Sequence, residues 1–158
     1  MPLLEELYLA ENELTSFNHL HNLPSLKKLN LRANKIESFK DGLPDLPALE
    51  YLNLRENLNT EAKELTQLCS FKKLNYLNMK GCPVADEKGD DFKKEIIFRC
   101  NDQIDVKIVN KEEITQEERD EAKAEKEERI RAEKEAEEEA ARLAAEEAER
   151  AKEEEEAE

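Results

Sequence analysis

Four segments of this sequence repeat one spacing of apolar residues that fits neither a helix nor a simple strand. The first segment, LEELYLAENEL, has leucines at positions 4, 7, 9 and 14 and an asparagine at position 12. The rhythm returns in LKKLNLRANKI, LEYLNLRENL and LNYLNMKGCPV, with start-to-start spacings of 22, 23 and 25 residues. A repeat of this length predicts a coil of stacked turns, because one turn alone cannot bury its apolar side chains.

These four segments resemble the leucine-rich repeat. The apolar residues between them resemble the 22-residue subclass of that family, which occurs in intracellular regulators of protein phosphatase and in axonemal proteins. They are Phe17, Leu20 and Leu23 after the first segment, and Phe39, Leu43 and Leu46 after the second. The resemblance implies an α/β solenoid, with short parallel strands on one side and helical or irregular segments on the convex side. We assign the four repeats to residues 1–84.

An asparagine follows the strand of each of the first three repeats, at Asn12, Asn34 and Asn57. We expect each buried amide to bond to backbone groups of its own turn and of the next one, which the coil cannot otherwise pair. Cys82 takes this place in the fourth repeat, and its thiol can donate only weakly. These positions therefore need no catalytic explanation.

Both ends of the coil need cover, because an open turn leaves leucines and a strand edge in water. We assign residues 85–114 to a C-terminal cap resembling that of the family, although CNDQ stands in place of the usual Leu-Pro. The expected apolar residues of this cap are Phe92, Ile96, Ile97, Val106, Ile108 and Val109. No polar helix or hairpin precedes Leu4. We expect further chain in relatives or a partner protein to cover that end, and the alternative is a frayed first turn.

Residues 115–158 predict one long, charged, single α-helix. Thr115 and Glu118 form a capping box, and no Gly or Pro follows Gln116. The only large apolar residues there are Ile130 and Leu143, too few for a coiled coil. We expect support from pairs four residues apart. These are Glu125 with Arg129, Glu127 with Arg131, Glu138 with Arg142, and Glu146 with Arg150. The alternative is a merely solvated acidic tail.

Enzyme chemistry has little support in the sequence. His19 and His21 lack further ligands for a metal, and three glycines cannot build a phosphate-binding loop. The three cysteines have no metal-ligand spacing, which favours a reducing compartment and small buried side chains. No apolar run is long enough to span a bilayer. We expect a soluble intracellular binding protein with no cofactor, metal or small-molecule substrate.

The outward positions of the predicted strands form three columns on the concave face of the coil. The first column is Glu6, Lys28, Tyr51 and Tyr76, the second is Tyr8, Asn30, Asn53 and Asn78, and the third, the basic stripe, is Ala10, Arg32, Arg55 and Lys80. Tyrosines beside cations are a composition favoured at protein interfaces. We predict that partners bind at Tyr8, Arg32, Tyr51, Arg55, Tyr76 and Lys80. An acidic protein segment is the expected partner, and the alternative is that these are ordinary solvated positions. Nucleic acid is disfavoured because the chain carries a net charge of −15.

Repeats, cap and a mixed-charge helix together resemble the axonemal radial-spoke family of leucine-rich-repeat-containing protein 23. That resemblance implies a structural role in the cytoskeleton of the cilium or flagellum, among several subunits of a large assembly. A rival resemblance is the acidic nuclear leucine-rich-repeat family, which binds histones or a protein phosphatase. Tails of that family are nearly pure Asp and Glu, whereas residues 116–158 hold nine Lys and Arg. A third resemblance is to an axonemal dynein light chain of this repeat type, which is less favoured because a long charged tail is not part of its pattern.

Overall fold

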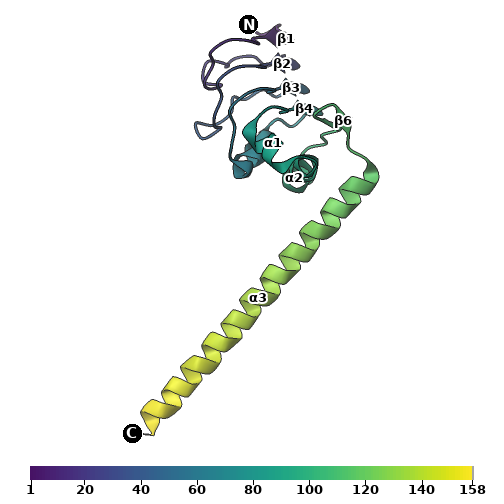
Figure 1. Ribbon diagram of the computed structural model, residues 1–158. Helices are drawn as coiled ribbons and strands as arrows, with labels where there is room; N and C mark the ends of the chain where they lie inside the picture. Colours follow the sequence, from purple (N-terminus) through teal and green to yellow (C-terminus); the bar gives the residue numbers. More distant parts are fainter. Residues whose placement is uncertain (158) are drawn as a thin grey trace. The chain divides into compact units, whose positions relative to one another are not determined.

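The computed structural model describes residues 1–157 and shows one sheet whose strands follow the order of the sequence (Figure 1). Four parallel strands come from the four repeats: β1 (Glu6–Tyr8), β2 (Lys28–Asn30), β3 (Tyr51–Asn53) and β4 (Tyr76–Asn78). Their central leucines, at positions 7, 29, 52 and 77, stand in register across the sheet. The predicted α/β solenoid of short parallel strands is confirmed.

The core lies behind the sheet and is built from the repeated apolar positions. Leu29 and Leu52 are fully buried, as are the leucines that flank them in each repeat. Phe17 and Phe39, from the segments between strands, meet edge to face with ring centroids 5.9 Å apart. Behind β3 the chain forms a 3-10 helix, η1 (Ala62–Ser70). Each turn therefore buries its apolar residues against its neighbours, as the repeat length predicts.

The asparagines form a ladder, but they bond to the preceding turn and not to the following one. Asn57 Nδ2 donates to the carbonyls of Leu54 in its own turn and Leu31 in the turn before, both at 2.9 Å. Its Oδ1 accepts from Ile36 N–H at 3.2 Å, also in the turn before. Cys82 Sγ lies 3.0 Å from the Leu54 carbonyl and takes the equivalent place. The predicted bonds within each asparagine's own turn are present, but the predicted direction between turns was wrong. Cys82 therefore needs no following turn for its bond.

Two helices and a hairpin close the C-terminal end of the coil. The helices are α1 (Pro83–Lys88) and α2 (Asp91–Cys100), and the hairpin strands are β5 (Ile108–Val109) and β6 (Glu112–Glu113). β5 continues the parallel sheet, whereas β6 pairs with it antiparallel. The turn residues Asn110 and Lys111 have φ of 51° and 68°, as a two-residue hairpin turn requires. The charged β6 then forms the edge of the sheet and discourages further pairing.

The apolar residues predicted for the cap are mostly buried, as expected. Phe92, Ile96, Ile97, Val106 and Val109 are buried, and Ile108 is half-buried. At the other end of the coil, Leu4, Leu7 and Leu9 are only half-buried. Their counterparts in the second repeat are fully buried, so the first turn remains partly open.

The helix α3 runs from Gln116 to Glu156, and the predicted capping box starts it. Thr115 N–H donates to Glu118 Oε2 at 2.8 Å, and Glu118 N–H donates to Thr115 Oγ1 at 3.2 Å. The chain divides into two compact units, Met1–Asp120 and Glu121–Glu158. The first turn of α3 therefore belongs to the repeat unit. Within the described residues, no helix is both long and apolar enough to cross a membrane.

The first turn of α3 is anchored to the cap by charged side chains. Lys93 Nζ lies 2.7 Å from Glu118. Arg119 donates to Asn101 Oδ1 at 2.9 Å and to the Val106 carbonyl, and it lies 3.1 Å from Asp105. These bonds explain why the boundary between the two units falls inside the helix and not at its start.

Ion pairs four residues apart run along α3, but two of the arginines predicted to pair with a preceding glutamate pair with a following one. Glu125 and Arg129 pair at 2.5 Å, as expected. Arg131 instead lies 4.0 Å from Glu135, and Arg142 lies 3.8 Å from Glu146. Each arginine has a glutamate four residues away on both sides, so sequence spacing alone does not choose between them.

Candidate partner-binding surface

The concave face, made by the outward side chains of β1–β4 and the residues that follow each strand, carries all six predicted binding residues. The sheet register places Lys28, Tyr51 and Tyr76 side by side in its first column. Tyr8 aligns with Asn30 in the second column. The basic residues Arg32 and Arg55 follow β2 and β3 by two positions. Backbone pairing of the strands therefore sets the columns in which these residues lie.

Two of the three tyrosines form a single aromatic platform. The rings of Tyr51 and Tyr76 stack with centroids 4.3 Å apart and an interplanar angle of 13°. Both side chains are half-buried, and burial raises the pKa of Tyr51. Stacking fixes both rings before a partner arrives, so their contact area is presented with little loss of side-chain entropy on binding.

Tyr8 stands apart from that platform. Its hydroxyl donates to Glu6 Oε2 at 3.0 Å, and this hydrogen bond raises the pKa of Tyr8. Glu6 also pairs with Lys28 Nζ at 3.2 Å. Tyr8 is 61% exposed and belongs to a polar cluster on β1 and β2. The structure therefore joins Tyr51 with Tyr76 but does not bring Tyr8 to them.

The asparagines of the second column hold the backbone of the basic stripe. Asn53 Oδ1 accepts from Arg55 N–H at 3.0 Å, and Asn78 Oδ1 accepts from Lys80 N–H at 3.1 Å. Both asparagines are buried. Strand alternation predicted that they face outward, but their amides turn back to the chain because the strand ends there and leaves N–H groups to satisfy.

Glu56, which the sequence reading missed, lies between the two arginines of the stripe. Its carboxylate is 3.2 Å from Arg32 Nε and 3.3 Å from Arg55 Nε. Arg32 also lies 3.7 Å from Glu11. Both glutamates have a positive φ, of 59° at Glu56 and 58° at Glu11. Glu11 follows Ala10 and Glu56 follows Arg55, both beyond the strand residues, so strand alternation does not extend to either glutamate.

Lys80 differs from Arg55 because it is followed by Gly81, whereas Arg55 is followed by Glu56. Gly81 has a φ of 83°, and a Cβ there would lie 3.1 Å from Glu56 Cγ. Glycine thus leaves room for the Glu56 side chain and brings no carboxylate of its own. Among the described residues no ion pair involves Lys80. Lys80 is exposed, so the stripe presents one cation whose charge is not already neutralised.

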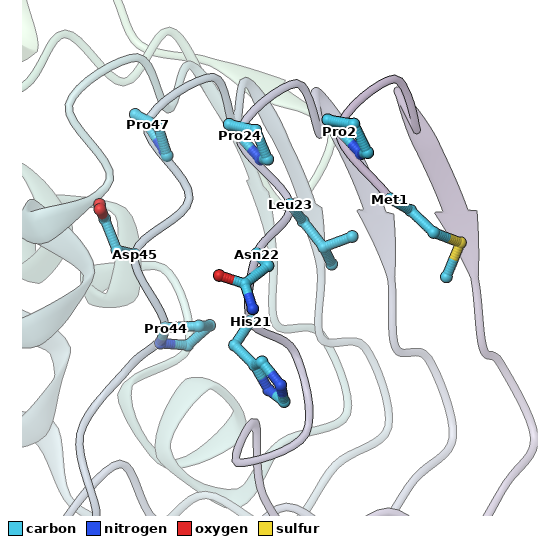
Figure 2. A pocket seen from close by; sticks show the side chains of 9 residues that line it. All are labelled: Met1, Pro2, His21, Asn22, Leu23, Pro24, Pro44, Asp45 and Pro47. Carbon is cyan, nitrogen blue, oxygen red and sulfur yellow. The ribbon is translucent and has the colours of Figure 1, made fainter.

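A pocket of about 520 Å³ lies away from the concave face, beside the first three turns. Figure 2 shows Pro2, Pro24 and Pro47 in a row, one from each turn, with His21 below them. Both predicted surface histidines, His19 and His21, are exposed. Within residues 1–157 no group of three or more His, Cys, Asp and Glu side chains could hold a metal ion.

Comparison with known proteins agrees with the fold. Residues 3–144 match the leucine-rich repeat family. The chain resembles a chain in the crystal structure of the Drosophila melanogaster SNF/U2A' complex, with 20% sequence identity and a TM-score of 0.66. The match covers 81% of this chain and 74% of that one, and this likeness concerns the fold alone. No curated protein matches the sequence. The family match supports a scaffold for protein interactions, and the chain belongs to the leucine-rich-repeat family.

Proposed function

We propose that this protein is a non-enzymatic structural subunit of the ciliary axoneme, within the radial spoke. It binds neighbouring spoke proteins through its concave face and through α3. The observation that carries the proposal is the combination of repeats, cap and a 41-residue charged helix in one chain. That combination is the architecture of the radial-spoke family that the sequence resembles. The expected location is the cytoplasm, in the cytoskeleton of the cilium or flagellum.

The concave face suits an acidic or amphipathic protein segment. The Tyr51–Tyr76 platform offers rigid apolar area, and Arg55 and Lys80 follow the same two strands. Aromatic residues next to cations are enriched where interfaces bind most strongly. A partner carboxylate meets Lys80 first, because the arginines are already paired with Glu56. To bind the arginines, the partner carboxylate must compete with Glu56.

The likeness to a chain of the Drosophila SNF/U2A' complex supports this use of the fold in a limited way. That crystal structure is of a complex, so a chain of similar fold takes part in an assembly. It supports neither a particular partner nor a cellular compartment for the present protein. The choice between compartments therefore depends on α3 and on experiment.

A second candidate function is an acidic nuclear regulator that binds histones or a protein phosphatase. The net charge of −15 favours it, because a strongly acidic surface attracts basic partners. The nine Lys and Arg among residues 116–158 favour the axoneme instead, because they convert an acidic tail into a helix laced with ion pairs.

Affinity capture from two extracts of the same ciliated cells tests the proposal. The parent protein is compared with Arg55→Glu/Lys80→Glu and with a charge-matched control, Lys72→Glu/Lys73→Glu, whose two lysines are exposed and lie outside the strands. From demembranated axonemes, we expect the parent and the control to recover radial-spoke proteins and the concave-face variant to lose them. Recovery of histones or phosphatase from nuclear extract, without spoke proteins from axonemes, would refute the axonemal assignment. Equal recovery by all three proteins would refute the concave face.

A further inference from the structure

Two of the three cysteines meet inside the cap. Cys69 is the penultimate residue of η1, and Cys100 is the last residue of α2. Their sulfur atoms lie 2.7 Å apart, and each side chain is 2% exposed. The sequence interpretation treated all the cysteines as small buried hydrophobes. It had no means of pairing two residues that are 31 positions apart and belong to different elements.

Cys82 provides the contrast. Its thiol occupies the asparagine position of the ladder and lies 3.0 Å from the Leu54 carbonyl. Burial raises the pKa of Cys82 to about 11. The reactive form of a cysteine is the thiolate, so this thiol is held in an unreactive state with a structural bond. Cys69 and Cys100 also lie near backbone carbonyls, of Arg99 at 3.5 Å and of Leu65 at 3.9 Å, but each of them has a second sulfur atom beside it.

We propose that Cys69 and Cys100 form an oxidative modification site, which a hydroperoxide converts to an intramolecular disulfide between η1 and α2. In the first step one thiolate attacks the peroxide, the O–O bond breaks, and a sulfenic acid forms with release of an alcohol or water. The second thiol then attacks that sulfur, and water leaves as the S–S bond forms. Two thiols lose two electrons and two protons in all, and the hydroperoxide is reduced.

The separation of the two sulfur atoms, 2.7 Å, is close to that of the bond. A disulfide has an S–S length of about 2.05 Å, so the two sulfur atoms need to move by well under an ångström. The burial of both side chains means that a hydroperoxide reaches them only when the end of α2 opens locally. Oxidation is therefore slower than for an exposed thiol, and the product fastens the end of α2 once it has formed.

The bridge would lie next to the residue that anchors the first turn of α3. Asn101 follows Cys100 directly and accepts the hydrogen bond of Arg119 in the first turn of α3. A bridge to Cys69 restrains this part of the cap against η1 and so restrains the anchor of α3. A disulfide also limits the freedom of the unfolded chain, which stabilises the folded cap.

Peptide mapping tests the site directly, because trypsin places the three cysteines in three peptides, 64–72, 81–88 and 100–107. The folded protein is exposed to hydrogen peroxide for many times as long as reduced glutathione in a parallel sample needs to be fully oxidised, because the buried thiols react more slowly, and is then denatured and alkylated. We expect peptides 64–72 and 100–107 to be joined, with the loss of two hydrogens, and peptide 81–88 to be alkylated. Joining through peptide 81–88, linkage between chains, or alkylation of all three peptides would overturn the proposal.

Two variants and one exchange measurement complete the test. Cys82→Ser should still form the joined peptide, and Cys100→Ser should not. Should Cys100→Ser fail to fold, the map of the parent protein decides alone. Hydrogen exchange in the last turn of α2 should slow at least several-fold in the oxidised protein. An unchanged exchange rate in that turn would show that the bridge does not restrain the cap.

Discussion

Replacing Asn57 with alanine removes the rung of the asparagine ladder that lies deepest in the coil. Asn57 is 1% exposed, and its three shortest side-chain hydrogen bonds, of 2.9 to 3.2 Å, go to backbone groups. Two of these groups keep another partner in the variant. The Leu31 carbonyl still accepts from Asn34, and the Leu54 carbonyl still accepts from Cys82. The Ile36 N–H, which is fully buried, loses its partner.

The expected cost follows from these bonds. A buried N–H without a partner costs about 1 to 3 kcal/mol, and each weakened carbonyl adds up to about 1 kcal/mol. We therefore expect Asn57→Ala to lower the free energy of unfolding by about 2 to 4 kcal/mol. Asn34→Ala should cost less, because the N–H that loses its partner belongs to Leu14, which is only half-buried. Asn12→Ala should cost under about 1 kcal/mol, since Asn12 is exposed and water replaces its bonds.

Tyrosine fluorescence is the right probe for this series. The chain has no tryptophan, and its three tyrosines, at positions 8, 51 and 76, all lie in strands of the sheet. Fluorescence therefore follows the repeat unit, whereas far-UV circular dichroism is dominated by α3 and mixes two units. Equal urea midpoints for Asn57→Ala and Asn12→Ala would refute the ladder as a source of stability.

Three further predictions concern the core and the junction with the tail. Leu52→Ala, at a fully buried position, should lower the free energy of unfolding by about 2 to 5 kcal/mol in the same urea titration; an unchanged midpoint would contradict the packing. The hydrogen bond from Lys93 lowers the pKa of Glu118 in the folded protein. The stabilisation of the folded state by Glu118 is therefore complete above the unfolded pKa near 4.5, and it is lost as the pH falls through the lower, folded pKa. The difference in urea midpoint between the parent and Glu118→Gln should therefore shrink from neutral pH to about pH 3, and a constant difference would exclude this pair. Limited trypsin digestion should cut α3 beyond Asp120 before it cuts the hairpin at Lys111, and the reverse order would contradict the anchoring of the first helical turn.

Much of this fold was predictable because the same spacing of apolar residues occurs four times in the sequence. The leucine spacing predicted the strands and their register, and Thr115 with Glu118 predicted where α3 begins. The direction of the asparagine bonds was not predictable, because the spacing shows that a buried amide is needed but not which neighbouring turn supplies its partners. The β5–β6 hairpin was missed, because Asn110-Lys111 lacks the glycine that usually marks such a turn.

Side-chain pairing across turns was harder to predict than the backbone. The columns correctly placed Tyr51 beside Tyr76, yet they did not include Glu56, which lies beside both arginines. Buried Glu64 of η1, which accepts hydrogen bonds from Ser38 and from Phe39 N–H, gave no signal in its own segment. Both glutamates have a partner from another turn, Arg32 for Glu56 and Ser38 for Glu64, at a separation that the local pattern does not encode.

Site-specific photo-crosslinking tests most directly the claim that the concave face binds an axonemal partner. A photoreactive phenylalanine analogue at Tyr76, on β4, is compared with the same analogue at Lys72, which is exposed and precedes that strand. After irradiation in demembranated axonemes, mass spectrometry identifies the attached proteins. We expect a radial-spoke protein to be crosslinked at position 76, through an acidic or amphipathic segment, and not at position 72. Spoke proteins crosslinked at position 72 alone, or at neither position, would contradict this expectation.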